Sequence, residues 1–130
     1  MTTEITMLLI VLGLLFLLTF VQGAYTAKTY GIKKAGGTRE DIPFPQPGFG
    51  GTLYRVIANL KEGLFYFVPL VLLTAILDVS NSYTVWGAQL YVIARVLHVP
   101  LYLAGSILRG AAFGLAVLGC GLLGYGLIGV

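Results

Sequence analysis

Charged residues are scarce in this chain of 130 residues, which has eight lysines and arginines, five acidic residues and one histidine. Charged residues make up 10% of the sequence, hydrophobic residues make up 58%, and the mean hydropathy is +0.92. A soluble domain carries about 25% charged residues. The composition therefore excludes an ordinary soluble domain and predicts an integral membrane protein, for which we expect no nucleic-acid partner.

Cysteine and histidine are each present only once, as Cys120 and His98. A single cysteine cannot form a disulfide within the chain, so cysteine pairing says nothing about the compartment. One histidine without a cysteine at ligand spacing also excludes the usual zinc sites, so we predict no metal. Cys120 lies among glycines and is interpreted as a small packing residue.

Long apolar runs dominate what is present, and each approaches the ~20 residues that cross a ~30 Å hydrocarbon layer as a helix. The predicted helices cover about residues 5–27, 53–78, 82–104 and 107–130. The runs are continuous rather than alternating, which argues against a β-barrel. The first run follows MTTE rather than basic residues, which favours a retained span over a cleaved signal. We therefore predict an all-α membrane protein, a four-transmembrane-helix bundle forming one domain over residues 1–130.

The loop over residues 28–52 holds most of the charge. Its charged side chains are Lys28, Lys33, Lys34, Arg39, Glu40 and Asp41. By the positive-inside rule this basic loop faces the cytoplasm, and both chain termini face the opposite side. We expect a bacterial inner membrane, with an intracellular eukaryotic membrane as the alternative.

One face of the second predicted helix is polar. Arg55, Asn59 and Glu62 are spaced i, i+4, i+7, which places all three on the same side. The apolar run that follows, residues 63–77, covers only ~22 Å at 1.5 Å per residue. That length is too short for the bilayer, so the polar triplet must lie at the membrane boundary or inside it.

A second polar face occurs in the third predicted helix, where Tyr91, Arg95, His98 and Tyr102 repeat at i, i+4, i+7, i+11. If the helix ends near Gly105, Arg95 lies ~15 Å below that end, close to the middle of the bilayer. A charged residue at such a depth usually serves a function.

A charge count suggests what these faces bind. No acidic residue follows Asp78, so Glu62 is the only nearby acid for Arg55, Arg95 and Arg109. Arginine cannot lose its proton in the membrane, and two positive charges therefore remain without a counter-ion. We expect these arginines to line a hydrated cleft that binds a ligand with carboxylates.

Each residue taken alone also has a simpler interpretation. Arg55 and Arg109 could extend to lipid phosphates, and Asn59 with Glu62 could hydrogen-bond a neighbouring helix. His98 alone would be interpreted as a packed core histidine. Two one-sided polar faces at matching depth nevertheless favour a shared site.

Two motifs in these helices resemble the MAPEG family, the membrane-associated proteins in eicosanoid and glutathione metabolism. The first is R-x3-N-x2-E, here Arg55, Asn59 and Glu62, followed by FVPLVLLTA. The second is R-x2-[YH]-x3-Y-x6-R, and its members are Arg95, His98, Tyr102 and Arg109. The resemblance covers nearly the whole chain.

The resemblance implies a microsomal glutathione transferase-like homotrimer. Glutathione, the co-substrate, would lie between neighbouring subunits in a cleft open to the cytoplasm. Carried over residue by residue, the binding candidates are Arg55, Asn59, Glu62, Arg95, His98 and Tyr102. Arg109, at the start of the fourth helix, would act on the thiol as the catalytic residue. The implied partners are two further copies, membrane lipids and a lipophilic electrophile.

These observations predict a transferase that conjugates glutathione thiolate to lipophilic electrophiles, with peroxidase activity as a variant. The alternative is a non-catalytic MAPEG-like scaffold that binds lipid or regulates a partner. It is favoured by Ile57 and Ala104, which stand where members of the family carry polar side chains. Gly63 also departs from the family, because an aromatic residue is common there. A cation exporter using Glu62 is disfavoured by the surplus of arginines.

Small residues recur in the fourth predicted helix. Ala112, Ala116, Cys120 and Gly124 follow one another at intervals of four. Small side chains in one stripe let helix backbones approach closely in lipid. We predict that this stripe forms a contact between helices, either within the bundle or between copies of it.

Overall fold

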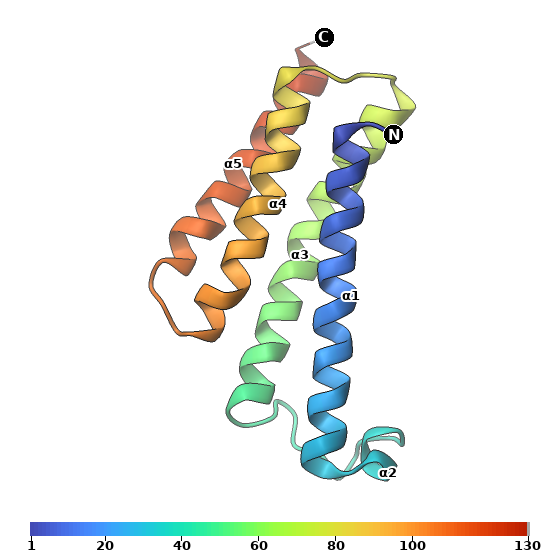
Figure 1. Cartoon of the computed structure of the whole chain (residues 1–130), viewed down its shortest axis with the longest axis vertical. Coiled ribbons are helices and arrows are strands. Elements are labelled where there is room, and N and C mark those ends of the chain that lie inside the picture. Colours follow the sequence, from blue (N-terminus) through green and yellow to red (C-terminus); the bar gives the residue numbers. More distant parts are fainter. Residues whose placement is uncertain (130) are drawn as a thin grey trace.

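The computed structural model describes residues 1–129, which form five helices (Figure 1). Their bounds are α1 Thr3–Tyr30, α2 Ile32–Ala35, α3 Phe49–Ile76, α4 Ser82–Leu103 and α5 Arg109–Ile128. The four long helices lie side by side, with α5 against α4 and with α1 against both α3 and α4. The short α2 and the basic loop lie at one end of the bundle, and the N-terminus lies at the other.

Three helices, α1, α3 and α5, are long and apolar enough to cross a membrane. The 22-residue α4 is also long, but Gln89, Arg95 and His98 lower its mean hydropathy, and it does not join that group. The predicted all-α class is confirmed, since residues 1–129 contain helices and no strand. That all four long helices cross a membrane stays a prediction.

Helix α3 begins at Phe49, about four residues before the predicted start. The glycines that precede residue 53 were interpreted as part of a loop, whereas Gly50 and Gly51 form the first turn of the helix. A Cβ atom at position 50 would lie 2.9 Å from the ring of Tyr25 on α1 and would overlap the side chain of Gln46. These glycines therefore serve close packing of α3 against α1 and the loop.

The start of α4 is fixed by a capping box. The Asn81 side chain accepts hydrogen bonds from the backbone amides of Tyr83, at 3.0 Å, and Thr84, at 3.1 Å. In return, the Thr84 hydroxyl accepts from the Asn81 amide at 2.9 Å. The box satisfies amides that the helix itself leaves without partners, and so sets the point where α4 begins.

The core lies mainly between α1, α3 and α4. Its largest fully buried side chains are Tyr91 and Phe67, whose rings stack with centroids 4.1 Å apart. Glu4 is also fully buried, in the first turn of α1, and within residues 1–129 neither carboxylate oxygen has a hydrogen-bond partner. The acidic N-terminal flank therefore contributes to the interior of the bundle.

Glycines bring α4 and α5 into backbone contact. A Cβ atom on Gly87 would lie 2.6 Å from the Leu123 nitrogen and 2.7 Å from the Gly119 oxygen. The buried face of α5 consists of Ala112, Ala116, Gly119, Leu123 and Gly126. Only the first two belong to the predicted stripe, because a helix of 3.6 residues per turn needs alternating steps of three and four to keep one face. Within one chain the stripe is therefore buried only at Ala112 and Ala116, and a contact of Cys120 and Gly124 with another copy stays a prediction.

The change Gly87→Ala tests this contact. The added methyl group would meet backbone atoms that cannot rotate away, so we expect the free energy of unfolding to fall by about 1–3 kcal/mol. The measurement is denaturant unfolding in detergent micelles. Gly114→Ala is the matched control, because a Cβ there meets nothing within 4 Å. It should leave stability unchanged or raise it by up to about 1 kcal/mol. Equal effects of the two changes would contradict the close contact.

Candidate functional site

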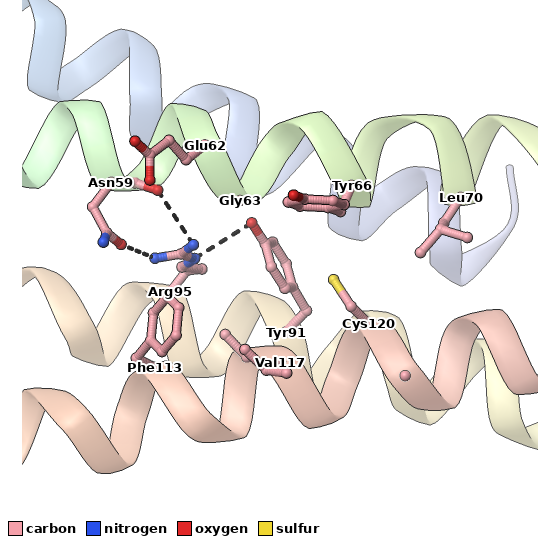
Figure 2. A pocket seen from close by; sticks show the side chains of 12 residues that line it. Asn59, Glu62, Gly63, Tyr66, Leu70, Tyr91, Arg95, Phe113, Val117 and Cys120 are labelled. Carbon is pink, nitrogen blue, oxygen red and sulfur yellow. Dashed lines mark hydrogen bonds between the residues drawn. The ribbon is translucent and has the colours of Figure 1, made fainter.

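A cleft of about 600 Å³ opens between α3, α4 and α5 (Figure 2). It is lined by Asn59, Glu62, Gly63, Tyr66, Leu70, Tyr91, Arg95, Phe113, Ala116, Val117, Cys120 and Gly121. Asn59, Glu62 and Arg95 lie together at one end, and apolar or aromatic residues form most of the remaining wall. The cleft is thus an apolar groove with a charged end.

Arg95 is the best-anchored residue of the cleft and is only 3% exposed. Its Nη1 donates to the Asn59 side-chain oxygen at 2.6 Å, and its Nη2 donates to the Asn59 carbonyl oxygen at 3.4 Å. Its Nε donates to the Tyr91 hydroxyl at 3.3 Å. All these acceptors are neutral, and three bonds leave part of the guanidinium's five N–H groups for a ligand.

Aromatic rings and a glycine hold the same guanidinium in position. Its Cζ lies 5.5 Å from the ring centroid of Tyr91 and 5.7 Å from that of Phe113. On the remaining side, a Cβ atom at Gly63 would overlap Arg95 and would lie 2.6 Å from the Tyr91 hydroxyl. Gly63 therefore gives the arginine the room to lie against the α3 backbone. The resemblance described above implies an aromatic side chain at this position, which would occupy that room.

Three other predicted residues form a chain of ring contacts near the end of α4. His98 is buried, and its ring lies 5.5 Å from the Tyr102 ring. The Arg109 guanidinium, at the start of α5, lies over the same tyrosine at 4.7 Å from its centroid. None of the three lines the cleft of this single chain.

Arg55 also lies outside the cleft lining. It is exposed, and its Nη2 donates to the Thr52 hydroxyl at 3.2 Å. Arg55 precedes Asn59 by one helical turn, as Arg109 precedes Phe113, so both arginines lie ~6 Å along their helices from a cleft residue. The structure therefore gathers Asn59, Glu62 and Arg95 in one cleft and places the other four candidates beyond its charged end.

Ile57, which departs from the family motif, is buried in the core at 3% exposure. A polar side chain at this position would have to face other core residues of the same chain. Its replacement by isoleucine thus leaves the cleft lining unchanged.

Comparison with protein families gives a match to the MAPEG family over residues 7–129. The chain belongs to the MAPEG family. Family membership and the three apolar helices together support an integral membrane protein of glutathione-related or eicosanoid metabolism. Neither the comparison with curated proteins nor that with solved structures gave a match.

Sequence reasoning missed several residues that line the cleft of this MAPEG protein. Tyr66 follows Glu62 by one turn, and Phe113 follows Arg109 by one turn, so helical spacing was the signal that could have found them. Cys120 packs against the core as predicted, and its half-buried side chain also lies in the cleft wall, which was not predicted (Figure 2). No group of three potential metal ligands lies among the described residues.

A double-mutant cycle on Asn59 and Arg95 tests how the buried charge is held. Asn59→Leu should lower the free energy of unfolding by about 1.5–3 kcal/mol, because it removes a hydrogen bond to a charged group. Adding Arg95→Met removes the charge that was left behind. The effects of the two changes should therefore be non-additive by about 1–3 kcal/mol in micelle unfolding experiments. Additive effects would show that the two residues do not act together.

Proposed function

We propose that this MAPEG protein is a glutathione transferase that joins the thiolate of glutathione to lipophilic electrophiles in the membrane. The observation that carries the proposal is the buried guanidinium of Arg95, which hydrogen-bonds only neutral acceptors at the end of an apolar cleft. These acceptors carry no charge and leave part of the five N–H groups unbonded, so an anionic ligand would add the ion pairing that a buried cation favours.

Glutathione matches the charges that surround this end of the cleft. It carries two carboxylates and one ammonium group. Arg95 and Arg55 would each bind a carboxylate, while the exposed Glu62 at the cleft would bind the ammonium group. The Asn59 amide would position the peptide beside Arg95. His98 and Tyr102 would border the bound tripeptide from the end of α4.

Arg109 would lower the pKa of the glutathione thiol, because a guanidinium beside sulfur stabilises the thiolate. It is the first residue of α5, whose start has no side-chain cap in the described structure, so the positive end of the helix adds to the effect. The thiol proton passes to water and the thiolate attacks the electrophilic carbon. With an aryl halide, the S–C bond forms, the C–halogen bond breaks, and the halide leaves with the bonding electron pair. The apolar wall of the cleft beside Phe113, one turn from Arg109, would hold the electrophile within reach of the sulfur.

A homotrimer of four-span bundles is part of this proposal. Arg55 and Arg109 lie beyond the cleft of one chain, and a neighbouring copy would enclose the charged end and bring them to the same ligand. We further propose that the basic loop and this charged end face the cytoplasm, because cations concentrate there.

A non-catalytic scaffold is the second candidate. Arg95 is already held by Asn59 and Tyr91, and Arg109 already lies on the Tyr102 ring, so both arginines have a structural use without any ligand. A scaffold of this kind would bind lipid in the apolar cleft and would turn over no electrophile.

Thiolate formation separates the two candidates. Glutathione added to the purified protein should produce the ultraviolet absorbance of thiolate at a pH where free glutathione is mostly thiol. Arg109→Ala should remove this absorbance and lower kcat/KM for a model aryl halide about a hundredfold, the size of one lost transition-state contact. Lys34→Gln, which removes a positive charge from the loop, is the control and should change neither reading.

Binding of glutathione without thiolate absorbance or turnover would support the scaffold. Absence of glutathione binding at millimolar concentration by calorimetry would contradict the proposal.

A further inference from the structure

Two of the eight tyrosines in this chain lie at unusual places in their helices. Tyrosine commonly anchors the end of a membrane helix at the headgroup level. Six tyrosines lie within about one and a half turns of a helix end, and these are Tyr25, Tyr30, Tyr54, Tyr83, Tyr102 and Tyr125. Tyr66 on α3 and Tyr91 on α4 lie well inside their helices, and both line the cleft. Anchoring at the membrane surface therefore does not explain these two.

The hydroxyl groups of Tyr66 and Tyr91 are held differently. That of Tyr91 accepts a hydrogen bond from Arg95 at 3.3 Å, and Tyr91 is only 1% exposed, so it helps to hold the guanidinium. Tyr66 is 70% exposed, and its hydroxyl has no hydrogen-bond partner within residues 1–129 (Figure 2). Tyr66 lies ~15 Å along α3 from Ile76, the last residue of the helix. Water is scarce at such a depth in a membrane, so a ligand in the cleft is the natural acceptor for this hydroxyl.

The Tyr66 side chain leans over the preceding turn of α3. Side chains of a helix point toward its N-terminus, so Tyr66 covers the position three residues earlier, which is Gly63. Gly63 has no side chain that could cover the hydroxyl, and Figure 2 shows the hydroxyl directed toward the charged end of the cleft. On the other side of Tyr66 the wall continues with Leu70. The hydroxyl therefore lies between the charged end and the apolar wall.

The order of groups along the cleft restricts which atom of a bound electrophile this hydroxyl can contact. In the proposed function the glutathione sulfur lies near Arg109 and the electrophile lies beside Phe113. Tyr66 lies farther from the charged end than Phe113 does (Figure 2). Its hydroxyl would thus contact an atom beyond the carbon that the thiolate attacks. A neutral hydroxyl donor is most effective at an oxygen on which negative charge develops during the reaction.

We propose that Tyr66 is a further catalytic residue, which donates a hydrogen bond to the carbonyl oxygen of an α,β-unsaturated ketone or aldehyde and makes such compounds the preferred electrophiles. The inference rests on the proposed function. The carbonyl oxygen of these compounds lies beyond the attacked carbon, at the far end of the conjugated system.

The reaction at this site needs no further reactant. The thiolate adds to the β-carbon, an S–C bond forms, and the electron pair of the C=C bond moves toward the carbonyl group to give an enolate. The Tyr66 hydroxyl stabilises the negative charge on the enolate oxygen. Water then gives a proton to the α-carbon, the carbonyl group forms again, and no group leaves.

The experiment compares two electrophiles of similar size with the purified full-length protein and glutathione. Benzylideneacetone forms an enolate, whereas the charge that develops on benzyl chloride leaves with the chloride. The measured quantity is the ratio of kcat/KM for benzylideneacetone to kcat/KM for benzyl chloride. Tyr66→Phe keeps the ring and removes the hydroxyl, and it should lower this ratio about tenfold, the size of one lost hydrogen bond to a charged group. An unchanged ratio would overturn the inference.

Tyr125→Phe is the matched control, because it removes the same hydroxyl from an exposed tyrosine outside the cleft lining. It should leave the ratio unchanged. An equal fall in Tyr66→Phe and Tyr125→Phe would show that the effect does not come from the cleft, and the assignment of Tyr66 would be wrong.

A second measurement needs neither glutathione nor turnover. The saturated ketone benzylacetone is added to the protein, and the stretching frequency of its bound carbonyl group is measured by infrared spectroscopy. A hydrogen bond from Tyr66 lowers this frequency, so Tyr66→Phe should raise it and Tyr125→Phe should not. The same frequency in the wild type and in Tyr66→Phe would contradict the contact.

Other results would assign the hydroxyl to a different task. Loss of the thiolate absorbance in Tyr66→Phe would place it on the sulfur, and a smaller oligomer by native mass spectrometry with an unchanged ratio would place it between copies. Either result overturns the inference. A wild-type protein that converts neither electrophile overturns the transferase and this role together, whereas an active protein with an unchanged ratio in Tyr66→Phe overturns this role alone.

Discussion

A permanently charged arginine buried within a hydrophobic bundle is the constraint on which the rest of this structure depends. Burying such a charge away from water is costly unless the charge is paired or well hydrogen-bonded. The chain offsets this cost around Arg95 with neutral acceptors on α3 and α4 and with two aromatic rings. Arg95 is therefore a fixed cation that hydrogen bonds stabilise. None of its hydrogen-bond partners is a carboxylate, so none of them neutralises its charge.

Glycines, which have no side chain, determine how closely the helices and the Arg95 guanidinium can approach one another. Gly63 lets the guanidinium lie against α3, and Gly87 with Gly119 lets α5 lie against α4. Close α4–α5 packing leaves α5 apart from α3 at the cleft, where Phe113 and Cys120 form one wall and Tyr66 the other. Backbone contacts on one side of the bundle therefore create the apolar groove on the other.

The fold class and part of the cleft could be predicted from the sequence. Continuous apolar runs predicted the helices, and helical spacing put Asn59 and Glu62 on the same face, where both line the cleft with Arg95. The pairing of Arg95 with Asn59 could not be predicted, because two helices of known period can meet at many relative heights and rotations. Gly50 and Gly51 were misread for a related reason: a glycine in a sequence looks the same whether it ends a helix or lets another element approach closely. The roles of Arg55 and Arg109 stay predictions, because their helices carry them to the charged end of the bundle but not into the cleft of a single chain.

The most direct test of this account is a cryo-electron microscopy map of the protein with bound glutathione. The account predicts that the Arg95–Asn59 hydrogen bond is retained and that a glutathione carboxylate oxygen lies about 3 Å from a guanidinium nitrogen of Arg95. Density for glutathione that avoids Arg95, or an Arg95 guanidinium turned away from the cleft toward lipid headgroups, would contradict it.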